Sequence, residues 1–520
     1  MRRLPRGGAN PVATRKHSEQ MTKLAEMIRG VLAIDPSAPA IEYERVWHAW
    51  GDIAAAAERL DAVLTEQGIS SGARVAVLLR NRPEFVAVLL SVLMSGRCLA
   101  TLNPAAPTDK LAADIVHVDC PVVLGLREDW DRPGLLAAAA ERGSACIAVD
   151  GEATVLAPGE PTRDGRPSAP GIAIEMLSSG TTGAPKRIPL PYRNLEKALL
   201  AAAAYETGRG EGDALRLRAG VAIVSAPMAH IAGVTGVMNN LLAGRKICLI
   251  DKFSVEAFRD AVARHRPKVA GAPPSALRMI LDADVPKADL ASLAAFRTGT
   301  APLDPDLADA FYEKYGIPVL QNYGATEFAG GAAGWTLKDF TTYWKAKRGS
   351  VGRLNPRTEA RTIDAETGLV QAPGETGLLE IRAPNIGDGE SWVRTTDLAI
   401  VDPDGFLFIK GRADNAIIRG GFKILPDDVV SVLQEHPAIR EAAVVGLNDP
   451  RLGQVPAAAY IPRSGITPPP EDELKTWLRS RLMAYQVPVT IRAVAELPRT
   501  PSMKVSLPEL RSLLEGPQHG

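Results

Sequence analysis

The sequence has no surplus of charge of either sign. Its 520 residues include 60 basic and 60 acidic ones, so the formal net charge at neutral pH is zero. A protein that binds nucleic acid usually shows a basic footprint. We therefore expect no nucleic-acid partner.

Cysteines are few and long apolar runs are missing. The four cysteines lie 22, 26 and 102 residues apart, form no CxxC pair and have only His117 close to any of them. This argues against a disulfide scaffold and a structural zinc site, and it suits a reducing cytosol. The longest apolar run, residues 85–94, is interrupted by Ser91 and is much too short to span a bilayer. We expect a soluble cytoplasmic protein with no integral membrane segment.

The first 20 residues differ from the rest of the chain. They contain Arg, Gly and Pro, a single acidic residue, and no apolar core of a secretion signal. An organelle transit peptide is one interpretation. A disordered extension that ends where a helical pattern begins at Met21 is the one we favour.

The rest of the chain divides into three stretches with different secondary-structure patterns. Between residues 70 and 325, apolar strand-like runs such as 74–80 and 246–250 alternate with helical patterns such as 254–265, which favours layered α/β structure with mostly parallel strands. From 349 to 410, short β-like pieces are separated by Gly, Pro and Asp. We predict a large domain over 21–410, with α/β layers and a small β-rich subdomain, and a small mobile α+β domain over 411–520.

Two short motifs invite a catalytic interpretation. GISSG at 68–72 matches the hydrolase pattern GxSxG, but a helical pattern precedes it and a strand follows, the reverse of a nucleophile elbow, so we predict a turn. SSGTTGAPK at 178–186 follows a strand and combines small hydroxyls, two glycines and a lysine, which suits phosphate binding. It is no Walker A loop, because the dipeptide Gly-Lys does not occur in the chain.

The 178–186 segment resembles the signature of the adenylate-forming enzymes, which include acyl- and aryl-CoA ligases, nonribosomal adenylation domains and beetle luciferases. Further segments resemble the family's other motifs in the same order along the chain: RTGTAPL (297–303), QNYGATE (321–327), RTTDLA (394–399), GRADNAIIRGGFKILPDDV (411–429) and LPRTPSMKV (497–505). RTTDLA departs by having Thr396 where the family has glycine.

The resemblance implies how ATP would be held. Activation of a carboxylate requires negative charge on the α-phosphate and the departing pyrophosphate to be stabilised. Thr326 is expected at the α-phosphate, Glu327 at Mg²⁺, and Asp397, assisted by Arg412, at the ribose hydroxyls. The full set expected at ATP or AMP is Ser178, Ser179, Gly180, Thr181, Thr182, Gly183, Lys186, Gly299, Thr300, Ala301, Asn322, Tyr323, Gly324, Thr326, Asp397 and Arg412, with Thr181, Thr182 and Lys186 at the β- and γ-phosphates.

The resemblance assigns the C-terminal lysine of the family to Lys504. That lysine reaches from the small domain to the carboxylate and phosphate oxygens during adenylation. Met503 stands where the family has glycine, and the basic residues that commonly follow are absent.

The resemblance also places a gate at His230 and an acyl pocket beside it. The pocket residues are expected to be His230, Ile231, Gly233, Val234, Gly324, Gly330, Gly331 and Ala332. They include no carboxylate that could hold the ammonium of an amino acid, and their small size leaves room for a ring or a medium chain.

The hinge of the small domain is expected at Asp414. The loop after it, Arg419, Gly420, Gly421, Phe422 and Lys423, would face the channel for coenzyme A. Asp428 matches the family's acidic residue after the proline, whereas Val430 replaces a second acid. No carrier-protein attachment site follows residue 505, so we expect a free-standing enzyme.

These expectations combine into an ATP- and Mg²⁺-dependent acid–thiol ligase. It would activate a hydrophobic carboxylic acid, aromatic, alicyclic or of medium chain length, as acyl-AMP and transfer it to coenzyme A. Two alternatives stay open: an enzyme that loads a separate carrier protein, and an inactive nucleotide-binding protein, which the presence of Lys186, Glu327 and Lys504 disfavours. The sequence leaves a homodimer open.

Overall fold

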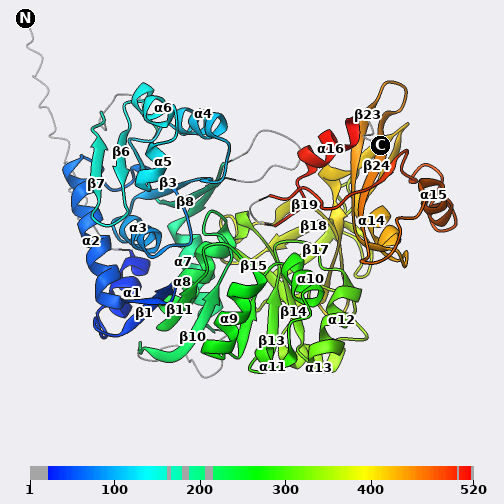
Figure 1. Ribbon diagram of the computed structural model, residues 1–520, viewed down its shortest axis with the longest axis horizontal. Helices are drawn as coiled ribbons and strands as arrows, with labels where there is room; N and C mark the ends of the chain where they lie inside the picture. The colour runs from blue at the N-terminus through cyan, green and yellow to red at the C-terminus, as the bar shows by residue number, and fades with distance from the viewer. Residues whose placement is uncertain (1–21, 161–165, 178–186, 205–214, 501–502, 517–520) are drawn as a thin grey trace, which may run out of the picture.

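A computed structural model describes residues 22–160, 166–177, 187–204, 215–500 and 503–516. The described chain forms a large body built from layered sheets and helices and a smaller C-terminal unit, coloured orange to red in Figure 1. This mixed α/β architecture confirms the predicted fold class.

The first layered unit is a mainly parallel sheet between helices. Its strand order is β7-β6-β5-β3-β4-β8-β9, and only the edge pairs β6–β7 and β8–β9 are antiparallel. Side chains alternate along β3: Val75 and Val77 pack with α3, whereas Ala76 and Leu78 pack with α4 and α6. The elements are β3 (Arg74–Leu78), β4 (Cys98–Leu102), β5 (Val122–Gly125), β6 (Ala145–Ala148), β7 (Thr154–Ala157), β8 (Ile172–Leu177), β9 (Arg187–Pro191), α2 (Trp50–Glu66), α3 (Pro83–Met94), α4 (Thr108–Val118), α5 (Arg127–Trp130) and α6 (Leu135–Glu141).

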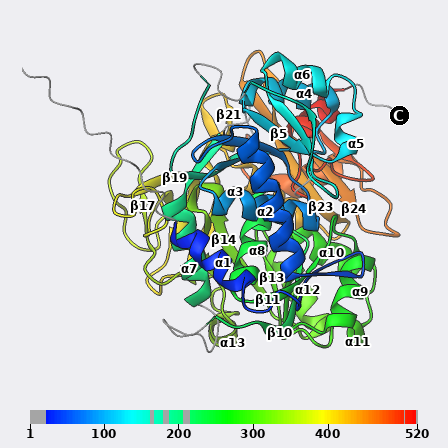
Figure 2. The same cartoon turned by 90° about the vertical axis from the view of Figure 1, so that its left-hand side faces the viewer.

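A second sheet has the order β10-β11-β1-β2 and shares a core with the first. Figure 2 shows α1 and α2 running across this side of the molecule. The elements are α1 (Lys23–Leu32), β1 (Pro39–Tyr43), β2 (Val46–Ala49), α7 (Tyr192–Ala204), β10 (Arg218–Val224), α8 (Ile231–Leu242) and β11 (Arg245–Leu249).

The third sheet has the order β12-β13-β14-β15-β16, and its strand β14 carries Asn322, Tyr323 and Gly324 of the candidate site. Its core includes a row of aromatic rings: the Phe296 ring on β13 lies between Phe258 and Phe311, with centroids 5.8 and 5.3 Å away. The elements are α9 (Val255–His265), β12 (Val269–Gly271), α10 (Pro274–Asp282), α11 (Lys287–Leu290), β13 (Ala295–Thr298), α12 (Pro305–Tyr315), β14 (Val319–Ala325), η1 (Thr326–Phe328), β15 (Gly330–Gly334), α13 (Leu337–Tyr343) and β16 (Arg353–Leu354).

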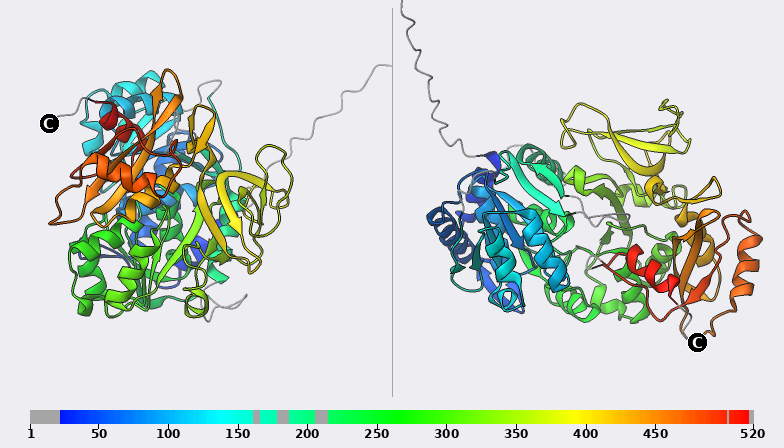
Figure 3. Two further views of the ribbon diagram at one scale, coloured as in Figure 1. Left: turned by 90° about the vertical axis from the view of Figure 1, so that its right-hand side faces the viewer. Right: turned by 90° about the horizontal axis from the view of Figure 1, so that it is seen from above.

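The β-rich stretch predicted after residue 349 forms an antiparallel meander. Its strands follow chain order: β17 (Glu359–Ile363), β18 (Gly377–Arg382), β19 (Val393–Val401) and β20 (Leu407–Arg412). Figure 3 shows this yellow sheet beside the orange C-terminal unit. The short helix η2 (Ala413–Asn415) leads from β20 into that unit, so residue 410 lies inside β20.

The C-terminal unit is a sheet with helices on both faces. In β23, Val444 packs against α14 and α15, whereas Val445 packs against α16. The strand order is β22-β21-β24-β23, with β25 parallel to β24. The elements are β21 (Ile417–Arg419), β22 (Phe422–Ile424), α14 (Pro426–Gln434), β23 (Ile439–Asp449), β24 (Gly453–Pro462), α15 (Glu471–Arg479), β25 (Ile491–Ala493) and α16 (Leu507–Glu515).

Several local predictions can be compared with these elements. GISSG at 68–72 forms the turn between α2 and β3, with Gly68 and Gly72 at φ of 74° and 76°. All four cysteines are free and buried. Among the described residues, no helix is long and apolar enough to cross a membrane.

Candidate active site

The candidate site begins where β14 turns through η1 into β15. Two glycines allow the backbone segments here to approach closely. A Cβ added to Gly299, just after β13, would lie 2.0 Å from Asn322 Oδ1, and one added to Gly324 would lie 2.4 Å from the Gly330 carbonyl oxygen. The neighbouring Thr300 has φ of +69°, which is unusual for a β-branched residue and typical of functional loops. Ala301 follows it in the same loop.

Tyr323 and Asp397 connect this strand to the meander. The Tyr323 hydroxyl on β14 donates a hydrogen bond to the Asp397 carboxylate on β19. Burial raises the pKa of Asp397, and the Tyr323 bond and the charge of Arg412 act in the opposite direction. Burial and the Asp397 carboxylate raise the pKa of Tyr323, so the phenol remains a donor. Sequence reasoning placed both residues at the nucleotide and did not foresee their bond.

Arg412 lies beside Asp397 in the β19–β20 register, but its guanidinium binds elsewhere. Its Nε lies 2.8 Å and its Nη2 2.6 Å from the two carboxylate oxygens of Asp414, and Nη2 also donates to the Thr396 hydroxyl at 2.8 Å. Arg412 therefore acts on Asp397 through its charge and holds the predicted hinge residue directly. The hydroxyl that replaces the family's glycine, Thr396, is one of its acceptors.

Lys504 of the C-terminal unit reaches this group of residues. Burial and the Arg412 guanidinium lower the pKa of Lys504, whereas Asp397 opposes the shift. The Lys504 charge in turn helps to lower the pKa of His230. The Lys504 side chain keeps contact with solvent, as expected if it meets a ligand that enters from outside. The Lys504 ammonium therefore lies within electrostatic range of Asp397, Arg412 and His230.

His230 stands at the N-cap position of α8 without a side-chain capping bond, and it is half-buried. Burial and the charge of Lys504 lower its pKa to about 4, so the imidazole is neutral at physiological pH. Both α7 and α8 contact β15, which carries Gly330 and Gly331. A Cβ added to Gly331 would meet no atom closer than 3.6 Å, and one added to Gly330 none closer than 3.7 Å.

Three of the predicted pocket residues are packed in the interior of the described structure. Val234 is 0% and Ala332 1% exposed, and each belongs to a hydrophobic core, whereas a residue that lines an open pocket keeps surface accessible to water. A Cβ on the buried Gly233 would lie 2.3 Å from the Pro227 backbone, so this glycine lets α8 pack on the preceding turn. We retain His230, Ile231, Gly324, Gly330 and Gly331 as candidate lining residues.

Thr326 and Glu327 form η1 at the end of β14, and Glu327 exposes its carboxylate. Its charge acts on Tyr323 and Arg412, which places it in the same group. The signature segment with Ser178, Ser179, Gly180, Thr181, Thr182, Gly183 and Lys186 lies outside the described residues. Its flanking strands, β8 and β9, pair with each other, and β9 contacts η1.

The segment predicted for coenzyme A lies in the C-terminal unit. Arg419 Nη1 donates to the Tyr485 carbonyl at 2.8 Å, and Gly420 and Gly421 have φ of 56° and 90°. Phe422 is 56% exposed and stacks on the Tyr485 ring at 4.6 Å. Lys423 follows on β22. A role in binding coenzyme A stays a prediction.

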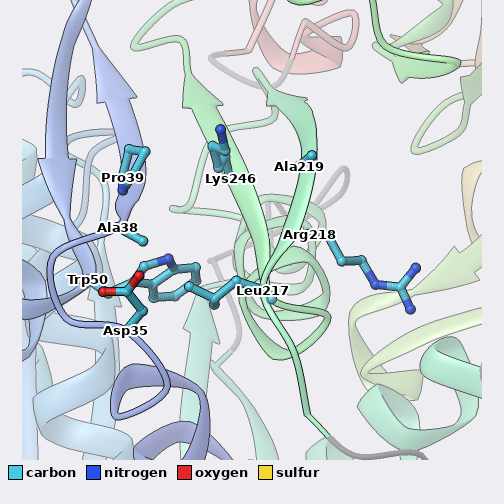
Figure 4. Close-up of a pocket in the computed structure, with 9 residues that line it drawn as sticks. Asp35, Ala38, Pro39, Trp50, Leu217, Arg218, Ala219 and Lys246 are labelled. Carbon is cyan, nitrogen blue, oxygen red and sulfur yellow. The ribbon is translucent and has the colours of Figure 1, made fainter.

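A cavity of about 270 Å³ lies in another part of the molecule (Figure 4). It opens at the ends of β1, β10 and β11, and none of its lining residues belongs to the group around Lys504. They are Asp35, Ala38, Pro39, Trp50, Leu217, Arg218, Ala219, Gly244 and Lys246. The chemistry described above is therefore not built around this cavity.

Comparison with known proteins decides the family. The profile described as "AMP-binding enzyme" matches residues 31–389, and that described as "AMP-binding enzyme C-terminal domain" matches residues 429–504. The chain belongs to the AMP-binding enzyme family. The second match ends at Lys504, the residue that the C-terminal unit brings to the site of this AMP-binding enzyme.

Individual relatives cover nearly the whole chain. The AMP-binding enzyme is 29% identical to 4-coumarate–CoA ligase 3 of Oryza sativa subsp. japonica over 90% of this chain and 87% of the relative. It is also 29% identical to 2-succinylbenzoate–CoA ligase of Bacillus cereus, over 87% of this chain and 90% of the relative.

Solved structures agree with this assignment. The o-succinylbenzoate CoA synthetase of Bacillus subtilis, in complex with an acyl-adenylate intermediate, has a TM-score of 0.74 at 25% identity, with 93% of this chain and 97% of that chain covered. ATP-bound MatB of Rhodopseudomonas palustris shares the fold, with a TM-score of 0.79 at 24% identity, and the match covers 94% of this chain and 98% of that chain.

Proposed function

We propose that this AMP-binding enzyme is an AMP-forming ligase that joins a hydrophobic carboxylic acid to the thiol of coenzyme A. In the first half-reaction the acid attacks the α-phosphate of ATP, which gives acyl-AMP and pyrophosphate. In the second half-reaction the thiol displaces AMP. The relatives named above, which are CoA ligases by name, support this reaction type.

The observation that carries the proposal is the position of Lys504. A lysine near a chain end is ordinarily surrounded by solvent. Here its ammonium is close enough to His230, Asp397 and Arg412 to exchange electrostatic effects with them. A cation held at this point can stabilise the negative charge that develops on the carboxylate and phosphate oxygens during adenylation. We infer that the described arrangement is the one that performs the first half-reaction.

The other residues of the site fit the demands of the nucleotide. Asp397, oriented by the Tyr323 hydroxyl, would accept hydrogen bonds from the ribose. The Thr326 hydroxyl would donate to the α-phosphate. The exposed carboxylate of Glu327 is the hard oxygen ligand that Mg²⁺ prefers, and a bound Mg²⁺ would neutralise phosphate charge.

The chemical class of the acid is inferred from the candidate lining residues. Ile231 and the glycines at 324, 330 and 331 provide no carboxylate, and His230 is neutral, so an ammonium group bound among them would have no charged partner. Burial of an unpaired charge costs several kcal/mol, which disfavours free amino acids. Glycine at 331 omits side-chain volume at this point, and an added Cβ would make only ordinary van der Waals contacts, which favours an acid with a ring or a medium chain over acetate.

The first experiment tests the reaction. Acid-dependent exchange of pyrophosphate into ATP should be seen with aromatic, alicyclic and medium-chain acids, among them benzoate, 4-coumarate, cyclohexanecarboxylate and octanoate. Acetate and phenylalanine should give much less. Lys504→Ala should lower this exchange by about 10²–10³-fold while thiolysis of supplied acyl-AMP survives. Equal loss in both half-reactions would refute the role of Lys504.

The second experiment tests the pocket and the acceptor. Gly331→Val should shift preference toward smaller acids, at roughly 1–3 kcal/mol for each lost methylene contact. Gly334→Ala is the matched control, because its added Cβ would meet β14 at an ordinary 3.5 Å. Unchanged acid preference in Gly331→Val would refute the pocket. Free coenzyme A at micromolar concentration should release AMP; release only with a carrier protein would replace the proposed acceptor.

A further inference from the structure

Arg499 links the turn that carries Lys504 to the centre of the C-terminal sheet. We propose that Arg499, anchored on Glu441, is a positioning residue that holds the Lys504 ammonium in place for adenylation. The inference rests on the proposed function of Lys504, and it concerns contacts that the family motif did not predict.

The anchor is a short ion pair on a rigid strand. Nη2 of Arg499 lies 2.7 Å from each carboxylate oxygen of Glu441, and about a quarter of each side chain is exposed. Glu441 belongs to β23, which packs against helices on both faces. The adjacent Arg440 reaches Asp282 on α10 of the large domain, with Nη1 and Oδ2 3.3 Å apart. The anchored strand therefore also touches the large domain in this arrangement.

The same guanidinium holds the residue before the lysine. Nη1 of Arg499 donates to the Met503 carbonyl oxygen at 2.9 Å. The turn is closed by two backbone bonds: the Met503 amide donates to the Thr500 carbonyl, and the Thr500 amide to the Lys504 carbonyl, both at 2.8 Å. Arg499 and Val505 pair across it as an antiparallel bridge. A displacement of Arg499 would thus move the backbone on both sides of Lys504.

The backbone of Met503 has an unfavourable conformation that the Arg499 hydrogen bond helps to hold. Its φ is +66°, a left-handed backbone that an L residue with a side chain rarely adopts. Relaxation of Met503 toward the usual negative φ would redirect the next residue. The Arg412 guanidinium repels the Lys504 ammonium and the Asp397 carboxylate attracts it, so electrostatics alone do not fix its position. A hydrogen bond from a charged donor to the Met503 carbonyl opposes both movements.

The test compares Arg499→Met with Arg511→Met. Arg511 is a matched control because its Nε donates to the Gly446 carbonyl on the same strand at 3.0 Å, without a described contact to the lysine turn. Arg499→Met should lower pyrophosphate exchange by about 10- to 100-fold, since a displacement near 1 Å can cost about 10²-fold. Its KM for ATP and its thiolysis of supplied acyl-AMP should stay within about threefold of the wild-type values, as should every rate of Arg511→Met.

Two further measurements make the result decisive. The pKa of His230, followed by NMR, needs no substrate: it should rise in Arg499→Met because Lys504 moves away, and stay unchanged in Arg511→Met. Arg499→Lys should recover part of the exchange rate. If Arg499→Met does not fold, Glu441→Gln should show the same half-reaction bias more weakly. Equal loss of adenylation and thiolysis, or an unmoved His230 pKa, would overturn the proposal. Absence of exchange in the wild type would instead refute the proposed function.

Discussion

Tyr323→Phe removes a single hydroxyl and should change how the enzyme depends on pH. The ring stays, and with it the edge-on contact with Phe328 at 6.2 Å, whereas the hydrogen bond to Asp397 is lost. Burial already raises the pKa of Asp397, and the Tyr323 bond opposes that rise. The substitution therefore raises the pKa of Asp397 further, which leaves the carboxyl protonated, and unable to accept both ribose hydrogen bonds, over a wider range of acidic pH.

The magnitude follows from the kind of bond. A hydrogen bond to a charged acceptor is worth about 1.5–3 kcal/mol. Because both side chains are half-buried, water can replace part of the lost bond, and we expect the lower end of this range, about 1.5 kcal/mol, which corresponds to about tenfold. The loss in kcat/KM for ATP should approach about tenfold on the acidic side and shrink as the pH rises and Asp397 ionises in both proteins.

The assay is pyrophosphate exchange measured from pH 5 to 9, with thermal unfolding in parallel. Tyr315→Phe is the matched control, because its buried hydroxyl donates to the Val285 carbonyl at 3.0 Å in another core. It should lower stability without moving the pH profile. In an Asp397→Asn background, Tyr323→Phe should have no further pH effect. An acidic limb that stays in place, or moves to lower pH, would refute this reasoning.

Three further predictions concern other parts of the site. Lys504→Ala should raise the pKa of His230 from about 4 toward 6.5. The lowered pKa of His230 makes folding stability fall as the pH drops from 6.5 through 4, so the variant should lose less stability over that range. The His230 pKa is measured by NMR and the stability by unfolding titrations. If neither changes, Lys504 lies away from His230 in solution. Gly299→Ala should lower the free energy of unfolding, measured in urea, by about 1–3 kcal/mol, because its Cβ would overlap Asn322 Oδ1. An unchanged free energy of unfolding would contradict this close approach. Asp414→Pro should slow thioester formation far more than adenylation, because proline fixes φ at about −65°. If the variant forms the thioester as fast as the wild type, the hinge lies elsewhere.

The strands and helices of the large domain were predictable because their patterns are local. The runs at 74–80 and 246–250 correspond to β3 and β11, and the helical pattern at 254–265 to α9. Likewise Gly299, Tyr323 and Asp397 could be assigned to one site through segments that resemble family motifs. Periodicity and short motifs therefore indicate which segments form the site.

Contacts between those segments could not be predicted. Tyr323 and Asp397 are 74 residues apart, and Arg499 and Glu441 58, so no local pattern links them. The preference of Arg412 for Asp414 depends on where β20 ends and η2 begins. Val234 was expected in the pocket because it follows His230 closely in the sequence, but its side chain belongs to the buried core under α8.

The burial of every cysteine has a chemical consequence for an enzyme that makes acyl-AMP. This mixed anhydride reacts with thiolates, and the protein's own thiols would compete with the acceptor if they were ionised and accessible. Burial raises the pKa of Cys98, and it raises that of Cys120 and Cys146 to about 12 and that of Cys248 to about 11. The folded chain is thereby protected from acylation by its own intermediate. The same burial prevents alkylating reagents from reaching these four thiols until the structure around each one opens. Their labelling rates therefore report local unfolding during turnover.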